Sequence, residues 1–464
     1  MTALPDQAAR RALRHSVPTD RGNANDRLGW VLLLVIGLSP LPLGSNRPAF
    51  WAMWGLLLGI VGLVYFMSLR LRRSALRISP WRVPELTIPF VLLLAFAVAQ
   101  ILPLGSLGYQ PLQTLPRGLV LPSASLSLDP ATTSLTLLQF ATYGLCALLF
   151  LQVGYRGSRA DRVLGAIFAI IVAYGLLGIV LQGQLSNLLG LPSPGSGPVA
   201  TGPFVNRNSY ATYLAYGLAI GVALAIGQLE RSDSRRQRHR RLAAIVLIAG
   251  GLFVIGTALI ATQSRMGFVA GLVGTLSVTL LALVGRRLGT GIWLGVLAGL
   301  LIGTIGMLVF NGGGLLERVG SLETAGDVRT DLYRQVWQMI LSSPLVGYGG
   351  GTFEGTFPLF HQLPVSPDVV WNKAHSTYLA LWAEFGFLFG SLPLLIVLAA
   401  AIRLLASRLS GLCLAAIGVI VVAAVHSIVD FSLEIEAVAF IFVAVVFLAI
   451  GASLGAADRR QEHA

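Results

Sequence analysis

Four short stretches of this 464-residue sequence place basic residues beside polar ones, in patterns suited to chemistry on a phosphate. Arginine presents a fixed fork of N–H donors that matches phosphate oxygens. Unperturbed histidine titrates near neutral pH, which suits a general base. The basic residues and their stretches are Arg207 in GPFVNRNSYATYL, Arg265 in ATQSRMGFVAG, Arg329 and Arg334 in VRTDLYRQVWQMI, and Lys373 and His375 in WNKAHSTYL.

This set of groups suits transfer of a sugar from a lipid-linked diphosphate. A polyprenyl-pyrophosphate donor keeps its tail in the bilayer, its charged linkage at the interface and its glycan in water. Pyrophosphate is already a good leaving group, so the transfer needs charge stabilisation there and a base for the acceptor hydroxyl. We therefore expect arginines to hold the diphosphate and His375 to deprotonate or orient the acceptor.

Other polar residues have both a structural and a functional interpretation. Asn206 and Asn208 either cap a helix or form a turn, or they help to bind the donor. Glu384 lies in an apolar stretch, where a carboxylate is costly and marks function or pairs with an external cation. His426 and Asp430 have i,i+4 spacing, which places them on one helix face and favours a structural polar pair.

The composition indicates that these residues are carried by a membrane protein. Hydrophobic residues make up 55% of the chain and charged residues 11%, against about 25% charged in a soluble domain. The formal net charge of +13 arises from short basic clusters between apolar runs, which is how membrane topology is encoded. The sequence predicts one all-α polytopic membrane domain and no nucleic-acid module.

Apolar runs of spanning length recur along the whole chain, since a spanning helix needs about 20 apolar residues. The twelve expected spans are 28–45, 49–69, 86–105, 134–153, 163–182, 208–229, 242–262, 266–284, 288–310, 377–402, 409–429 and 435–455. The first has a proline-rich end, and the seventh and eighth are joined by a tight turn at Gln263–Arg265.

The distribution of Lys and Arg predicts the orientation of these spans. With both termini in the cytoplasm, 25 of the 33 basic residues fall in cytoplasmic segments. This asymmetry is a strong topology signal, because cationic loops resist translocation. The eight external residues are Arg47, Arg117, Arg207, Arg265, Arg318, Arg329, Arg334 and Lys373. A lone arginine at a membrane boundary is usually an interface anchor, and this interpretation is kept for Arg207 and Arg318.

The expected organisation is a cytoplasmic tail (1–27), nine spans (28–310), a large external loop (311–376), three spans (377–455) and a second cytoplasmic tail (456–464). Shorter external loops cover 106–133 and 183–207. The large loop is too long to be a simple connector, and long loops more often carry function. It is expected to contain an amphipathic helix near Asp331–Leu341, followed by the turn-rich stretch SPLVGYGGGTF.

Several functional classes lack their motifs in this sequence. There is no DxD carboxylate pair, P-loop, dinucleotide fingerprint, HExxH zinc motif or GxSxG elbow. Cys146 and Cys413 lie in apolar segments, where small buried residues are expected. We therefore expect neither a metal site nor a cofactor.

At these residues the chain resembles the O-antigen ligase and O-unit polymerase family of bacterial envelope biogenesis. The matching stretches occur in the family's order over about 200–435. The Arg329 to Tyr333 step, a later PLVGYGGG and the AHSTYL block are the most specific of them. The stretches are GPFVNRNSYATYLA, TQSRMGFVAG, VRTDLYRQVWQMILSSPLVGYGGGTF, AHSTYLALWAEFGFLFG and HSIVDFSLEI.

The resemblance implies an all-helical, metal-independent inverting glycosyltransferase of the bacterial inner membrane with a periplasmic active site. It implies an undecaprenyl-pyrophosphate-linked glycan donor and a lipid or glycan acceptor. The family's essential histidine corresponds to His375, and its essential arginines correspond to Arg265 and Arg329. Arg207 and Arg334 match less uniformly basic positions, so the resemblance implies assistance in donor binding.

Rival functions stay open at this stage. An O-antigen or exopolysaccharide repeat-unit polymerase would use the same motifs. A polysaccharide transporter or flippase would also have many spans, but the sequence has no inverted repeat and few charged residues in mid-membrane. A structural scaffold is disfavoured by the large loop that bears the motifs.

Overall fold

The computed structural model describes residues 20–104, 112–114, 120–122, 124–182, 199–229, 235–286 and 322–462. Within these residues the regular structure is helical except for one antiparallel hairpin, formed by β1 (Leu112–Thr114) and β2 (Val120–Pro122). In this hairpin Leu112 pairs with Pro122. The expectation of an all-helical membrane fold is confirmed, whereas the small hairpin in the 106–133 loop was not predicted.

Eight helices in the described part are long and apolar enough to cross a membrane. They are α3 (Pro48–Leu71), α4 (Pro84–Ile101), α5 (Pro130–Gly154), α6 (Gly157–Gln182), α8 (Arg207–Leu229), α9 (Arg235–Ala261), α10 (Arg265–Arg286) and α17 (Glu436–Gln461). α14 (Thr377–Gly390) and α15 (Leu392–Ala406) form a ninth candidate if they are counted as one broken span. The helix α16 (Gly411–His426) is apolar but has only 16 residues. The expected span 288–310 lies outside the described residues, so the count of twelve stays a prediction.

Two expected spans differ from the observed helices. The first helix, α2, covers Asp20–Leu38 and ends two residues before Pro40, instead of covering 28–45. The expected span 377–402 is broken, because α14 and α15 meet at 72°. Gly386 has φ +71 near this break, and a Cβ there would lie 2.4 Å from the carbonyl oxygen of Leu345. Only glycine fits this position, and a sequence of apolar residues does not reveal such a break.

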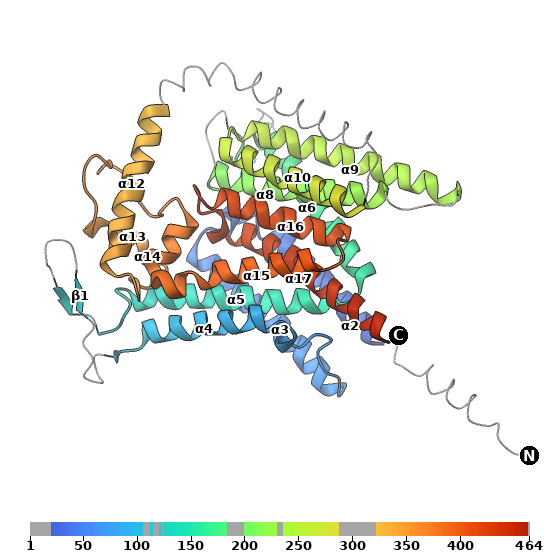
Figure 1. Cartoon of the computed structure of the whole chain (residues 1–464), viewed down its shortest axis with the longest axis horizontal. Coiled ribbons are helices and arrows are strands. Elements are labelled where there is room, and N and C mark those ends of the chain that lie inside the picture. Colours follow the sequence, from blue (N-terminus) through green and yellow to red (C-terminus); the bar gives the residue numbers. More distant parts are fainter. Residues whose placement is uncertain are drawn as a thin grey trace, which may run out of the picture.

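The long helices lie side by side and form one bundle (Figure 1). α16 and α17 lie in its middle, with α8, α9 and α10 on one side and α3, α4 and α5 on the other. In α8 and α17, 72% of the most apolar window is buried, against 22% in α3 and α4. The outer helices expose large apolar side chains such as Leu63 and Phe253, as expected for contact with lipid.

The pairing of α5 with α17 depends on small residues at their contact. A Cβ on Gly154 would lie 2.5 Å from the carbonyl oxygen of Leu448, and one on Gly451 would lie 2.6 Å from that of Leu151. Gly451 and Gly455 are four residues apart, the small-xxx-small spacing that lets membrane helices approach closely. This contact fixes α17, whose first residues adjoin the polar end of the bundle.

The large loop forms a compact unit with its own core at one end of the bundle. It contains α12 (Leu322–Ser342), α13 (Phe353–Thr356) and a 3-10 turn at Phe357–Leu359. Figure 1 shows α12 crossing the direction of the bundle helices. Its buried face, including Leu332 and Val336, packs with Tyr348 and with residues of α14. The predicted amphipathic helix near Asp331–Leu341 is confirmed.

Substitution of Gly451 by Ala tests the close approach of α5 and α17. The added methyl group would overlap the backbone of α5, so we expect a loss of stability of about 1–3 kcal/mol. Gly256→Ala is the matched control, because a Cβ there meets nothing within 4 Å. Thermal unfolding in detergent should give a lower Tm for the first variant and an unchanged or higher Tm for the second. Equal Tm values would contradict this packing.

Candidate functional site

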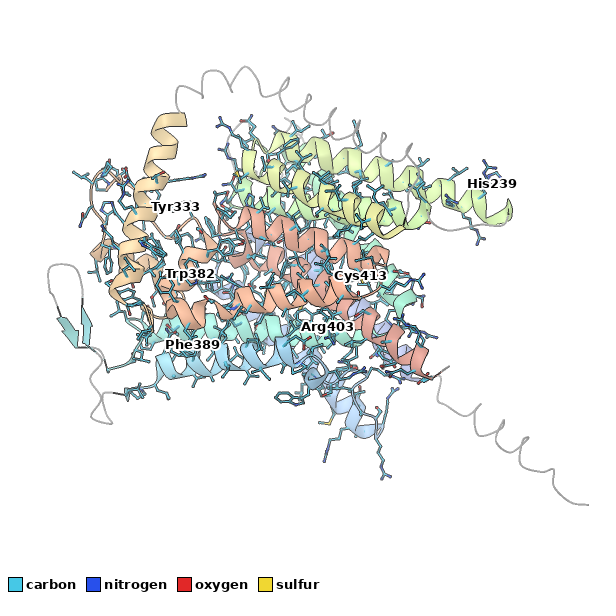
Figure 2. The ribbon with its side chains drawn as sticks, viewed as in Figure 1. His239, Tyr333, Trp382, Phe389, Arg403 and Cys413 are labelled. Atoms are coloured by element: carbon cyan, nitrogen blue, oxygen red, sulfur yellow. The ribbon has the colours of Figure 1, made fainter. Side chains whose placement is uncertain are left out.

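The polar segments singled out in the sequence lie at the end of the bundle that carries α12. α8 begins at Arg207 and α10 at Arg265, while His375 lies two residues before α14. The segment that joins α16 to α17 contains Asp430. Figure 2 labels Tyr333 of α12 at this end, and His239 of α9 at the far end of the bundle. The candidate site is therefore assembled from helix ends that are distant in sequence.

Asn208 connects three of these segments. Its backbone N–H donates to Asn206 Oδ1 at 2.7 Å, which fixes the turn that carries Arg207. Ser264 Oγ donates to Asn208 Oδ1 at 2.9 Å. Asn208 Nδ2 in turn donates to Asp430 Oδ1 at 3.5 Å. The start of α8 is thus tied both to the turn before Arg265 and to the segment between α16 and α17.

A buried polar cluster surrounds the Asp430 carboxylate. Thr212 Oγ1 lies 2.9 Å from both His426 Nδ1 and Ser432 Oγ, and Ser432 Oγ donates to Asp430 Oδ2. His426 Nδ1 lies 3.6 Å from Asp430 Oδ2. Thr212, His426 and Asp430 are each 1% exposed. Burial raises the pKa of Asp430, and the hydrogen bond from Ser432 and the charge of His375 oppose that rise.

The predicted helical pairing of His426 with Asp430 was wrong in its geometry, although the two side chains do approach. α16 ends at His426, and Asp430 lies beyond it in a turn. Their contact arises because the chain folds back after the helix. The closest hydrogen-bond partners of both side chains are hydroxyl groups, which the i,i+4 argument did not include.

His375 is held in an unusual backbone conformation just before α14. Its φ is +52, a left-handed value that costs a non-glycine residue about 1–3 kcal/mol. Tyr333 OH donates to the His375 carbonyl oxygen at 2.8 Å. Next to it, Ser376 Oγ donates to the Ser427 carbonyl oxygen at 3.3 Å, and Thr377 Oγ1 to that of Asp430 at 3.2 Å. These bonds hold the strained residue against the Asp430 segment.

The imidazole of His375 is half-buried between aromatic rings. Its centroid lies 5.4 Å from that of Phe431 and 6.0 Å from that of Trp371, both in edge-to-face geometry. Its Nδ1 is buried and has no hydrogen-bond partner among the described residues. Burial lowers the pKa of His375, Asp430 opposes this shift and Arg329 adds to it. A neutral imidazole at neutral pH can accept a proton.

Arg329 brings a cation to this imidazole from α12. Its charge lowers the pKa of His375. It also opposes the rise that burial causes in the pKa of Tyr333, which lies one helical turn further along α12. The Arg329 side chain is exposed, and it forms no ion pair with a side chain that the structure describes. Such a guanidinium can bind an incoming anion without first breaking a salt bridge.

Arg334 lies on the same helix but takes part in a different contact. Its Nη1 lies 2.6 Å from Asp331 Oδ1, and its side chain is 65% exposed. Five residues separate Arg334 from Arg329, which places them on different sides of α12. The structure therefore groups Arg329 with His375 but gives no contact between Arg334 and the Asp430 cluster.

Lys373 and Glu384 belong to a second polar group. Lys373 Nζ lies 2.6 Å from Glu434 Oε2. Burial disfavours the charged form of Lys373, but Glu434 outweighs it and the pKa of Lys373 is raised. The backbone carbonyl oxygen of Glu384 accepts from Gly349 N at 2.9 Å, and that of Ala383 accepts from Tyr348 N at 3.0 Å. The backbone of α14 thus holds the glycine-rich turn, in which Gly349 and Gly351 have positive φ.

Four residues of the site were not predicted from the sequence. Thr212 lies four residues after Asn208 in α8, and Tyr333 lies four residues after Arg329 in α12. Each therefore shares a helix face with a residue that the sequence had singled out. Ser264 directly precedes Arg265, and Ser432 follows Asp430 by two residues. Helical spacing could have identified the first two, whereas the hydroxyls in turns gave no signal of their partners.

The balance of charges around His375 can be tested without an activity assay. Removing the cation in Arg329→Gln should raise the pKa of His375, and removing the anion in Asp430→Asn should lower it. The pH dependence of His375 modification by diethylpyrocarbonate, followed by peptide mass spectrometry, measures both shifts. His239 on α9 is the internal control. Shifts of the same sign in both variants would contradict this geometry.

Comparison with known protein families adds an independent finding. Residues 250–391 match the family model described as O-antigen ligase. The match confirms the resemblance seen in the motifs, and it includes Arg265, Arg329 and His375. No curated protein sequence gives a significant match to the chain.

Proposed function

We propose that this protein transfers a glycan from undecaprenyl pyrophosphate to an acceptor hydroxyl, because residues 250–391 match the family model described as O-antigen ligase. The observation that carries the proposal is the grouping of Arg329 and His375 beside the Asp430 cluster. The proposed setting is the bacterial inner membrane, with this end of the bundle facing the periplasm. The excess of basic residues in the segments predicted to be cytoplasmic supports that orientation.

In the proposed reaction the acceptor oxygen attacks the anomeric carbon of the donor sugar. The acceptor proton passes to the neutral imidazole of His375, while the bond from the anomeric carbon to the pyrophosphate oxygen breaks. The leaving group departs as undecaprenyl pyrophosphate. A single displacement of this kind inverts the anomeric configuration, and the scheme uses no metal ion.

The arginines have the role of stabilising the leaving group. Charge grows on the pyrophosphate as the bond breaks, and positioned guanidinium groups offset it. Arg329 approaches from α12, and Arg265 begins α10, where the helix dipole also favours an anion. Arg207, Asn206, Asn208 and Arg334 assist donor binding in this scheme. Lys373 and Glu384 support the loop that faces the donor.

Substitution of His375 by Ala tests the base directly. We expect loss of surface-glycan assembly, with turnover reduced about 10²–10⁴-fold, because the acceptor hydroxyl loses its proton acceptor. Membrane insertion and expression should be unchanged. His239→Ala is the control, since this exposed histidine lies at the far end of the bundle. Normal long-chain glycan in the His375 variant would rule out the proposed base.

The two arginines of α12 provide a matched pair. Arg329→Gln should reduce turnover of a lipid-linked donor about 10²–10³-fold, as expected for loss of one charge-stabilising donor. Arg334→Gln should have a much smaller effect, because Arg334 is paired with Asp331 and lies on a different side of α12 from Arg329. Turnover by the purified variants measures both. If Arg334→Gln gave the larger loss, the assignment of Arg329 would fail.

Ligase and polymerase activities differ in the products that accumulate when the gene is deleted. Loss of a ligase leaves lipid-linked polymer beside an unmodified lipid acceptor, whereas loss of a polymerase leaves single repeat units. Electrophoresis of surface glycans, with the lipid-linked intermediates analysed in parallel, separates them. A transporter would move the donor across proteoliposomes without converting it, and the proposal fails if that is observed.

A further inference from the structure

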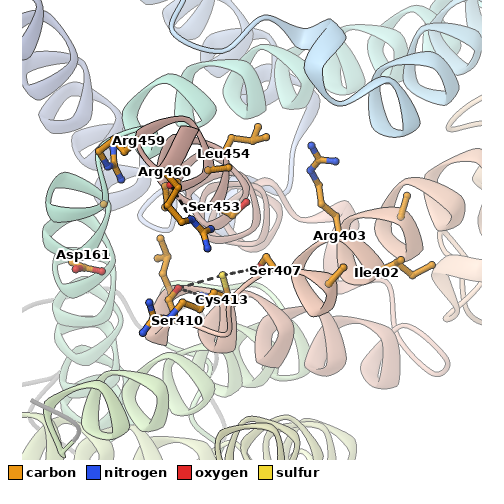
Figure 3. Close-up of a pocket in the computed structure, with 18 of the residues that line it drawn as sticks. Asp161, Ile402, Arg403, Ser407, Ser410, Cys413, Ser453, Leu454, Arg459 and Arg460 are labelled. Atoms are coloured by element: carbon orange, nitrogen blue, oxygen red, sulfur yellow. Dashed lines mark hydrogen bonds between the residues drawn. The ribbon is translucent and has the colours of Figure 1, made fainter. Parts of the chain in front are cut away.

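A cleft of about 1320 Å³ opens at the end of the bundle opposite the candidate site. It lies between the ends of α15 and α17 and the beginnings of α6 and α16. Figure 3 shows Arg459 and Arg460 of α17 on one side, and Ser410 and Cys413 of α16 on the other. Small-molecule sites usually have about 300–1,000 Å³, so this cleft is large enough for part of a lipid.

The charges that line the cleft are unbalanced. Four arginines and two acidic residues contribute to it, an excess of two positive charges. Arg403 is neutralised by Glu85, with 2.6 Å between Nη1 and Oε1. The other three arginines, Arg408, Arg459 and Arg460, form no ion pair with a carboxylate among the described residues.

Few of the N–H donors of these three arginines are used in hydrogen bonds within the described residues, so the others can bind a ligand. Arg459 Nη1 donates to the Tyr155 carbonyl oxygen at 3.4 Å. Arg460 Nε donates to the Ala456 carbonyl oxygen, within its own helix, at 3.3 Å. Arg408 is exposed and has no hydrogen-bond partner within the described ranges. A phosphate that accepts from several such forks is bound through charge-assisted hydrogen bonds.

The first turn of α16 adds to the attraction for an anion. Ser410 caps this 16-residue helix by accepting from Cys413 N at 3.2 Å, and both residues line the cleft. The positive end of the helix dipole therefore points toward the same space as the arginines. It supplements the arginine cluster and is not needed to define the site.

The remaining wall of the cleft is apolar. Ile402, Ala399 and Ala406 of α15 contribute accessible apolar surface to it, and Ile402 is 58% exposed. The lining residues Leu412 and Leu454 are themselves buried. A soluble phosphate would leave this surface in contact with water, whereas acyl chains would cover it at a gain of about 25 cal/mol per Å². The combination of a cationic rim and an apolar wall fits an amphiphile.

We propose that this cleft binds one anionic phospholipid of the bilayer. Arg408, Arg459 and Arg460 hold its phosphate, and its acyl chains lie against Ile402, Ala399 and Ala406. Bound there, the lipid joins α15, α16 and α17 at the end remote from the candidate site. The inference is independent of the proposed transferase activity.

Lipid-dependent thermal stability of the delipidated full-length protein tests the site. Phosphatidylglycerol should raise the Tm in detergent, whereas phosphatidylethanolamine and inorganic phosphate should raise it little. The double variant R408Q/R460Q should lose most of the shift. R70Q/R73Q is the matched control, because it removes two exposed arginines at the end of α3 that do not line this cleft.

The outcomes that would overturn the proposal are distinct. An equal phosphatidylglycerol shift in both double variants would mean that no specific arginine cluster binds lipid. Equal stabilisation by phosphatidylethanolamine would remove the role of net negative charge, and an equal effect of inorganic phosphate would remove the role of the acyl chains. If R408Q/R460Q is unstable without lipid, native mass spectrometry can instead compare how much phosphatidylglycerol R459Q and the wild-type protein retain. Unchanged retention of one phosphatidylglycerol would then exclude the site.

Discussion

The architecture of the candidate site depends on burying one carboxylate, Asp430, at the end of an apolar bundle. A carboxylate that is 1% exposed must be compensated by hydrogen bonds, since an unpaired buried charge costs several kcal/mol. Asn208 and Ser432 supply donors, and the same segment holds the backbone of Thr377. The carboxylate therefore ties the start of α8 to the link between α16 and α17, and the carbonyl oxygen of the same residue holds the start of α14.

This constraint explains how His375 keeps a strained backbone conformation. The residue lies between Tyr333 of α12 and the Asp430 segment, so the large loop and the bundle hold it from both sides. Arg329 lowers the pKa of the imidazole and Asp430 raises it. The two charges thus shift the pKa of His375 in opposite directions. The Arg329 guanidinium stays exposed and is accessible to an anion.

Arginines serve different purposes at the two ends of the bundle. At the end with α12, where few basic residues occur, Arg329 lies beside a histidine and a buried carboxylate. At the other end basic residues are numerous, and pairs such as Arg82 with Asp458 and Arg403 with Glu85 connect neighbouring helices. The cleft with Arg408 and Arg460 lies among them. The number of arginines at each end does not distinguish these roles, whereas the side chains that each arginine contacts do.

Much of the fold could be predicted from the sequence, because apolar length and amphipathic periodicity determine helices directly. Eight of the expected spans correspond to single long helices, and the amphipathic helix of the large loop was also predicted. The break between α14 and α15 was not predicted, and neither was the positive φ of Gly386, where the backbone of Leu345 approaches too closely for a side chain. In the site, the sequence singled out Arg329 and His375 by residue type, and the structure brings the two side chains within electrostatic range of each other. The hydroxyls of Ser264 and Ser432 gave no such indication, because their partners are determined only by where the chain folds back.

The most direct test of the account is a cryo-electron microscopy structure of the protein with a non-reactive analogue of the lipid-linked donor. The account predicts diphosphate density in contact with the Arg329 and Arg265 guanidinium groups, with His375 facing the anomeric carbon. Diphosphate density elsewhere, such as among the arginines of the opposite cleft, or a donor bound away from His375, would contradict it.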